Sequence, residues 1–111
     1  MARLNYVELP VGEIAKAKAF YETAFGWSLT EFGPTYAASM TGDTDIGLQA
    51  DATEATRAPL PVIDVADLEA ALAAVRDAGG TISRSIFAFP GGRRFQFLDP
   101  AGNELACVQA D

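Results

Sequence analysis

The feature that most constrains the fold of this chain is an internal repeat with a spacing of 54 residues. Val11 aligns with Val65, and five further pairs keep the same spacing: Glu13 and Asp67, Ile14 and Leu68, Ala17 and Ala71, Ala24 and Ala78, Gly26 and Gly80. Repetition at a fixed spacing indicates a duplicated structural unit. Two amphipathic helices that each follow a strand would also share some of these matches. We favour duplication, because the segments that follow recur in the same order.

Hydrophobic periodicity predicts the same element order in both halves. In the first half, alternation indicates a strand at 4–11, helical spacing indicates a helix at 13–25, and three short strands are expected at 27–32, 35–40 and 45–50. In the second half we expect a strand at 60–65, a helix capped by Asp67 that runs to about 78, and strands at 81–86, 94–98 and 104–109. Turns rich in glycine and proline separate these strands.

The polar, alanine-rich segment 51–58 is interpreted as the linker between the halves. The predicted fold class is α+β, with two βαβββ modules whose paired curved sheets enclose a cleft. We expect one domain over residues 1–111, with module one at about 1–52 and module two at about 58–111.

The composition excludes several functional classes. Half of the residues are hydrophobic, which supports a packed core, and the formal net charge is −7. An acidic chain repels phosphate backbones and anionic membrane surfaces, so we expect no nucleic-acid and no membrane partner. The single cysteine, Cys107, excludes an intrachain disulfide. The N-terminal residues have no signal-peptide pattern, so a cytoplasmic location is expected.

Three motifs, in order along the chain, resemble those of the vicinal oxygen chelate superfamily, which includes glyoxalase I, bleomycin-resistance proteins and extradiol dioxygenases. They are residues 6–11 (YVELPV) with 19–27 (AFYETAFGW), residues 65–71 with 78–80, and residues 94–105 (RFQFLDPAGNEL). Most motif residues have a structural interpretation. Phe20, Tyr21 and Phe25 are expected to face the sheet as apolar anchors, and residues 99–102 are typical of a turn.

The resemblance also implies where a metal would be bound in metal-dependent members. Those positions correspond here to Tyr6 and Leu60 on the first strands of the halves, and to Gly47 and Ala106 on the last strands. Such sites need imidazole or carboxylate ligands, and the chain has no histidine. We therefore expect no metal and no cofactor, which removes glyoxalase-type isomerisation and ring-cleaving dioxygenation as direct inferences.

Strand alternation predicts which residues line the cleft that remains. The neighbouring positions, Val7, Leu9, Ile46, Leu48, Ile63, Leu105 and Cys107, should point under the helices. The cleft should be mostly apolar with a few polar tips, which is typical of a small-molecule site. The predicted ligand-binding residues are Tyr6, Glu8, Gly47, Gln49, Leu60, Val62, Ala106 and Val108.

Four further residues have both a functional and a structural interpretation. Trp27 could stack on a ligand, but a packing role is favoured. Arg93 and Arg94 could clamp an anion at the rim of the cleft, or be ordinary hairpin charges. Cys107 should be buried, with no histidine to activate it, so a nucleophilic role is not expected.

Three functional hypotheses follow, and the sequence leaves open whether the protein is an enzyme. The favoured one is a metal-independent binding protein for a small apolar or aromatic molecule, held in the cleft between the modules. The alternative is a metal-free isomerase, epimerase or lyase in which Glu8 or Tyr6 transfers a proton. An interaction module is the third. The resemblance also implies a homodimer.

Overall fold

The computed structural model describes residues 1–111, which divide into two compact units. One unit is Tyr6–Leu60, and the other combines Met1–Asn5 with Pro61–Asp111. The elements in chain order are β1 (Arg3–Pro10), α1 (Ile14–Phe25), β2 (Leu29–Glu31), β3 (Tyr36–Ser39), β4 (Asp45–Gln49), β5 (Leu60–Asp64), α2 (Leu68–Asp77), β6 (Thr81–Phe89), β7 (Gly92–Leu98) and β8 (Glu104–Ala110). None of the helices is long and apolar enough to span a membrane.

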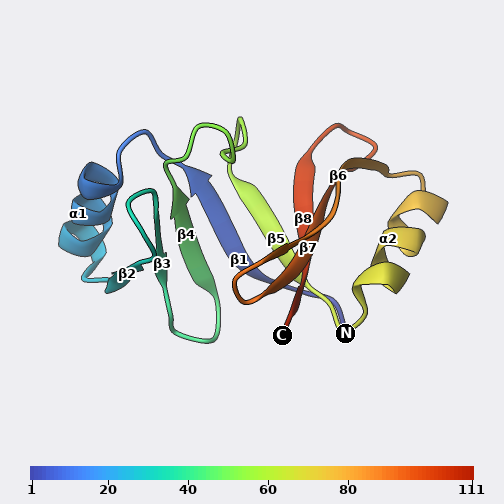
Figure 1. Cartoon of the computed structure of the whole chain (residues 1–111), viewed down its shortest axis with the longest axis horizontal. Coiled ribbons are helices and arrows are strands. Elements are labelled where there is room, and N and C mark those ends of the chain that lie inside the picture. The colour runs from blue at the N-terminus through green and yellow to red at the C-terminus, as the bar shows by residue number, and fades with distance from the viewer. The chain divides into compact units, whose positions relative to one another are not determined.

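The first unit consists of a sheet and one helix that lies beside it (Figure 1). Its strands follow the order β2-β3-β4-β1, with β1 and β4 parallel and the other pairs antiparallel. The register places Leu9 opposite Leu48. Helix α1 packs on one face of the sheet, and the buried residues of this α1 core are Ile14, Leu29, Ala37 and Leu48. Burial of this apolar stripe is the main favourable contribution to docking of the helix.

The second unit repeats this arrangement with α2 beside its own sheet (Figure 1). The strand order is β5-β8-β7-β6, with β5 and β8 parallel and the β8–β7 and β7–β6 pairs antiparallel. The buried residues of the α2 core are Leu68, Phe95, Phe97 and Cys107. Each unit therefore follows the order strand, helix, three strands, which confirms the predicted α+β class and its βαβββ modules. That the modules enclose a cleft stays a prediction from the sequence.

The helix ends also follow the sequence signals. Gly26 ends α1 in the left-handed region with φ 69°, which glycine adopts without steric cost, and its N–H donates to Glu22 O. Asp67 begins α2, where its carboxylate Oδ1 accepts a hydrogen bond of 3.0 Å from Ala70 N. Glu13, the counterpart of Asp67 in the repeat, makes no side-chain cap. The two helices thus begin at equivalent positions of the repeat, but only α2 has a side-chain cap at its N-terminus.

Two predicted strand boundaries were wrong in the β6–β7 hairpin. Both strands extend toward the turn, so that Phe89 pairs with Gly92 and only two residues separate the strands. Gly91 has φ 111°, a conformation that favours glycine and permits this short connection. Conversely, β2 is shorter than predicted, because Trp27 and Ser28 lie outside it. The sequence therefore predicted the turn at the correct place, but it predicted a longer connection between the strands than the structure has.

The predicted burial of the aromatic residues of α1 was also partly wrong. Tyr21 packs against the α1 core, but Phe20 and Phe25 are both 60% exposed. Consecutive helical residues point about 100° apart, and Phe20 points to one side of the stripe that contains Ile14, Ala17 and Tyr21. Phe25 is the last residue of the helix, and its ring lies against Trp27 instead. Val7 is half-buried and belongs to neither core.

Candidate functional site

The face of the first sheet opposite α1 carries the most distinctive polar side chains of this unit. Leu9, Ile46 and Leu48 point toward the α1 core. Because side chains alternate along a strand, Tyr6 and Glu8 on β1 lie on the opposite face. The register places Glu8 across from Gly47 and Tyr36 across from Gln49. Residues from β1, β3 and β4 therefore meet on one face.

Three of these side chains form a hydrogen-bonded group, which we call the Tyr–Tyr–Glu group: Tyr6, Tyr36 and Glu8. The hydroxyl oxygens of Tyr6 and Tyr36 are 2.5 Å apart, and the Tyr36 hydroxyl donates to Glu8 Oε1 at 3.1 Å. A hydroxyl has one proton to donate. Because the only hydroxyl proton of Tyr36 lies in the hydrogen bond to Glu8, Tyr6 is the donor in the hydrogen bond between the two hydroxyls. The chain of donors therefore runs from Tyr6 through Tyr36 to the carboxylate.

Gly47 provides the space in which the two tyrosine hydroxyls meet. A Cβ atom at this position would collide with the hydroxyl oxygens of both Tyr6 and Tyr36. Gly47 is buried and lies in the middle of β4, where a glycine often marks a close approach by another group. The glycine is therefore a structural requirement of the Tyr–Tyr–Glu group.

The environment of the group fixes the protonation state of Tyr36. Burial raises the pKa of Tyr36 far above its usual value of 10.0, and the neighbouring Tyr6 and Glu8 raise it further. Tyr36 thus remains a neutral donor at physiological pH. Glu8 is only 3% exposed, so its carboxylate is largely removed from water. A buried carboxylate with a hydroxyl donor is suited to orient a polar ligand atom or to exchange a proton with one.

The predicted residues on the second sheet lie on the face opposite α2. Ile63 and Leu105 pack against the α2 core, so alternation places Val62, Ala106 and Val108 on the other face, with Val62 paired to Ala106. Leu60, at the start of β5, and Ala106 have no exposed surface, and Val62 is 4% exposed. A ligand can reach these three residues only if the atoms that cover them move.

Of the eight predicted ligand-binding residues, the structure brings Tyr6, Glu8 and Gly47 together in one cluster. Gln49 lies on the same face, but its Oε1 accepts a hydrogen bond of 2.9 Å from Asp51 N and so closes a turn. A role in ligand binding stays a prediction for all eight. The sequence analysis did not identify Tyr36. The signal available was its alternation with Ala38, which becomes informative only once the register of β3 against β4 is known.

The positions that hold a metal in metal-dependent relatives do not fit one here. Leu60 and Ala106 have no donor atom, Gly47 has no side chain, and the hydroxyl of Tyr6 bonds to Tyr36. No group of three or more His, Cys, Asp or Glu side chains in the structure is arranged to hold a metal ion. Of the two positions in the first unit, Tyr6 belongs to the Tyr–Tyr–Glu group, and Gly47 leaves space for its hydroxyls.

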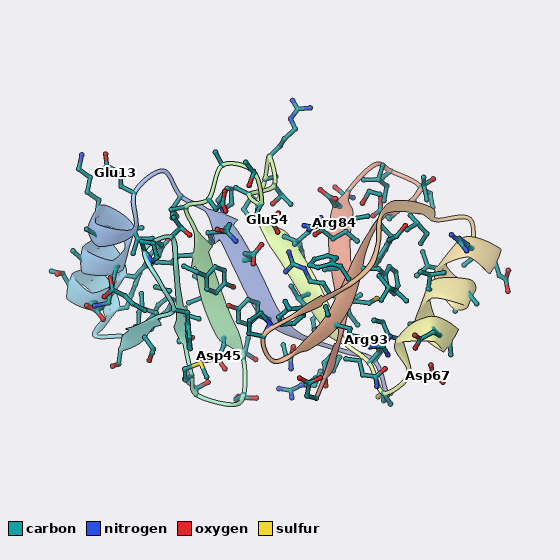
Figure 2. The ribbon with its side chains drawn as sticks, viewed as in Figure 1. Glu13, Asp45, Glu54, Asp67, Arg84 and Arg93 are labelled. Carbon is teal, nitrogen blue, oxygen red and sulfur yellow. The ribbon has the colours of Figure 1, made fainter.

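The two adjacent arginines of β7 point in opposite directions. Arg93, which is labelled in Figure 2, forms a double hydrogen bond with Glu69 of α2, at 2.6 and 3.1 Å, near the start of the helix. Arg94 lies on the other face, where its Nη2 donates to Gln96 at 3.2 Å. The two side chains therefore cannot act together as a clamp, which corrects the pairing considered from the sequence.

The contacts of Trp27 and Cys107 indicate packing roles for both residues. Trp27 stacks on Tyr21 at 5.6 Å and on Phe25 at 5.2 Å between ring centroids, and it is 42% exposed. It packs against α1, as the favoured packing role implies, but it remains partly exposed. Cys107 is 3% exposed within the α2 core, and burial raises the pKa of its thiol to about 11. A thiol of this kind is a poor nucleophile.

Comparison with known families gives a match over nearly the whole chain. The family model described as the Glyoxalase/Bleomycin resistance protein/Dioxygenase superfamily matches residues 3–107. No curated protein matches the sequence.

Several solved structures share the fold at low sequence identity. The NAD-dependent benzaldehyde dehydrogenase from Legionella pneumophila is 20% identical with a TM-score of 0.78, over 96% of this chain and 99% of that chain. The methylmalonyl-CoA epimerase from Mycobacterium tuberculosis is 17% identical with a TM-score of 0.75, over 97% and 87%. A glyoxalase/bleomycin resistance protein/dioxygenase superfamily member from Vibrio splendidus 12B01 is 18% identical with a TM-score of 0.72, over 100% of both chains. At these identities the likeness shows the fold alone.

Proposed function

We propose that this chain, which belongs to the Glyoxalase/Bleomycin resistance protein/Dioxygenase superfamily, is a metal-independent binding protein for a small apolar or aromatic molecule. The observation that carries the proposal is the Tyr–Tyr–Glu group, which stands where metal-dependent relatives begin their ligand set. It supplies hydroxyl and carboxylate groups on a sheet face that also includes the small residues Ala38 and Gly47. Such a combination is typical of small-molecule sites.

The direction of the hydrogen bonds supports a ligand with a polar substituent. Tyr6 donates to Tyr36 and Tyr36 donates to Glu8, and a hydroxyl oxygen that donates its proton in one hydrogen bond can also be an acceptor in another. A phenol, amide or indole N–H would extend the chain by one donor. Cooperative chains of this kind strengthen each bond in a site of low dielectric.

The alternative function is metal-free proton transfer by an isomerase, epimerase or lyase. The same chain of hydroxyls favours it, because a substrate proton that reached Glu8 could be returned through Tyr36. The similarity in fold to a methylmalonyl-CoA epimerase is consistent with this alternative. Its test is the exchange of the α-hydrogens of a simple acyl thioester in D2O, which wild type should catalyse and Glu8→Gln should not.

The binding proposal is tested on protein treated with EDTA, with phenol, benzamide and indole as probes. A ligand at about 100 times its Kd raises the free energy of unfolding by about 2.7 kcal/mol, which a thermal-shift assay resolves. We expect at least one probe to raise Tm without metal, and Tyr36→Phe to weaken its binding by roughly tenfold, the value of one hydrogen bond.

The matched control is Tyr21→Phe, which removes the same atom from a tyrosine on the helix side of the same unit. It should leave the Kd of the probe unchanged. The binding proposal fails if none of the probes shifts Tm, or if Tyr36→Phe and Tyr21→Phe bind the probe as tightly as wild type.

We also propose a homodimer, supported by the exposed aromatic rings of α1. Phe20 and Phe25 are large apolar side chains on the surface, and contiguous exposed apolar area often marks an interface. Light scattering should give twice the mass of the chain, and a Phe20→Ser and Phe25→Ser double variant should give the mass of one chain. A monomeric wild type would refute this proposal.

A further inference from the structure

The side-chain amide of Gln49 is held in one orientation by the segment that follows β4. Its Oε1 accepts a hydrogen bond of 2.9 Å from Asp51 N. A backbone N–H can bond only to the oxygen end of an amide, so this contact fixes which end of the Gln49 side chain is which. The Nε2 end, with its two N–H groups, therefore lies on the side of the amide that faces away from Asp51 N.

The turn that holds this amide is itself well bonded. Asp51 O accepts hydrogen bonds from Glu54 N at 3.0 Å and from Ala55 N at 2.9 Å. Asp51 Oδ1 accepts from Thr53 N at 2.9 Å and from Thr53 Oγ1 at 2.7 Å. The backbone of Asp51 is thus fixed, and rotation of the Gln49 amide would leave its N–H without an acceptor, which is costly. The orientation of the amide is therefore built into the turn.

Gln49 lies on the sheet face of the Tyr–Tyr–Glu group. It is half-buried, across from Tyr36 on β3 and from Pro10 on β1, and Gly47 precedes it by two residues on the same face. The hydroxyl proton of Tyr36 lies in its hydrogen bond to Glu8, and a proline side chain has no polar atom. The two N–H groups of Gln49 are donors that no hydrogen bond of the first unit uses.

A half-buried donor of this kind selects among ligands. A molecule that covered this face would remove water from Gln49 Nε2, and the lost hydrogen bond to water must be replaced by an acceptor on the ligand. An apolar group at the same place leaves the N–H groups without a partner, so such a ligand is rejected. A carboxylate would be expensive to remove from water, whereas a carbonyl oxygen accepts the bond without that cost.

We propose that Gln49 is a specificity-determining residue, and that its Nε2 donates a hydrogen bond to a neutral carbonyl oxygen of the ligand. The ligand class is then an aromatic ketone or amide rather than a hydrocarbon of the same shape. This inference rests on the proposed function, because it requires a small molecule on the face of the Tyr–Tyr–Glu group. It adds the acceptor that this molecule must carry.

The test compares two phenols of nearly the same shape, 4-hydroxyacetophenone and 4-isopropenylphenol, on EDTA-treated protein at a slightly acidic pH where both are neutral. The first has a C=O group where the second has C=CH2. We expect the ketone to bind wild type roughly fivefold more tightly, the value of one neutral hydrogen bond. In NMR spectra, the ketone should shift the Nε2–H resonances of Gln49 and leave those of Gln109 in place.

Gln49→Glu is the decisive variant, because glutamate keeps an oxygen for Asp51 N but has no N–H to donate. It should bind the two phenols equally tightly. Gln109→Glu on β8 is the matched control, since Gln109 Oε1 likewise accepts from a backbone N–H, that of Leu68 at 2.8 Å. It should keep the fivefold preference. Slow hydrogen exchange of Asp51 N–H in Gln49→Glu shows that the turn is intact.

The outcomes separate this inference from the proposed function. Tyr36→Phe, which tests the proposed function, should weaken binding of both phenols alike and leave the preference for the ketone unchanged. Equal binding of the two phenols to wild type, or an unchanged preference in Gln49→Glu, overturns the role of Gln49 and leaves the proposed function standing. Failure of both phenols to bind overturns both. If Gln49→Glu does not fold, the affinities and the Gln49 resonances of wild type decide.

Discussion

The hydroxyls of Tyr6 and Tyr36 meet at 2.5 Å over the backbone of Gly47, from positions 30 residues apart in the sequence. The Tyr36 hydroxyl in turn donates a hydrogen bond to Glu8 Oε1. Tyr6, at the position where the family resemblance implies a first metal ligand, here belongs to a hydrogen-bonded group.

Gly47→Ala should destabilise the protein, because the new Cβ collides with both tyrosine hydroxyls. Overpacking of a buried position typically costs about 1–3 kcal/mol. Chemical denaturation of the variant measures this cost. Gly12→Ala is the control, since nothing lies within 4 Å of its Cβ. In a background with Tyr6→Phe and Tyr36→Phe the cost of Gly47→Ala should fall; an unchanged cost would show that the hydroxyls are not the cause.

Tyr36 should give the protein a distinct alkaline transition. Because the pKa of Tyr36 is raised in the folded state, the protonated form is favoured by folding. Its contribution to stability is full below the unfolded pKa of about 10 and is lost as pH rises above it. Absorbance at alkaline pH should show that Tyr36 ionises only with unfolding, and that this late component is absent in Tyr36→Phe. Ionisation of all three tyrosines in the native state near pH 10 would contradict this prediction.

Asp67→Ala should cost about 1 kcal/mol, because it removes the side-chain acceptor that caps α2 at Ala70 N. For a domain of this size that corresponds to a fall in Tm of about 4 °C. Glu13→Ala is the matched control, since Glu13 holds the equivalent position of α1 and makes no cap bond. Equal losses in the two variants would show that the cap bond contributes nothing.

Cys107 should be inert to thiol reagents in the folded protein. Burial raises its pKa from the usual 9.0 to about 11, so the thiolate is scarce at neutral pH. The same shift favours the folded state below about pH 9, and this contribution is lost as pH rises through about 11. Reaction with a disulfide reagent at pH 8 should therefore follow unfolding. Rapid modification of native protein would indicate an accessible thiolate, and Cys107→Ala controls for reaction elsewhere.

The sequence was sufficient for the modules and for the direction of most side chains. Alternation placed Leu9 and Leu48 toward the α1 core and Tyr6 and Glu8 away from it, because strand periodicity is a local property. The capping role of Asp67 was equally local. The repeat predicted the order of elements, since a duplicated unit folds in the same way twice.

Features that depend on long-range register could not be predicted. Tyr36 meets Tyr6 only because β3 pairs with β4 and β4 pairs with β1 in one register, and this information is spread over 30 residues. Arg84 reaches Phe87 through a pairing irregularity that leaves no pattern in the sequence. Helical spacing suggested that Phe20 faces the sheet, but the stripe that contacts the sheet is narrower than the apolar face of α1.

The most direct test of the proposed function is a calorimetric titration of EDTA-treated protein with the probe that raises Tm most, repeated with Tyr36→Phe. We predict that wild type binds without metal, that added Zn²⁺ or Ni²⁺ leaves Kd unchanged, and that Tyr36→Phe raises Kd by roughly tenfold. Binding that requires a metal ion, or that is equally tight in Tyr36→Phe, would contradict the proposal that the Tyr–Tyr–Glu group holds the ligand.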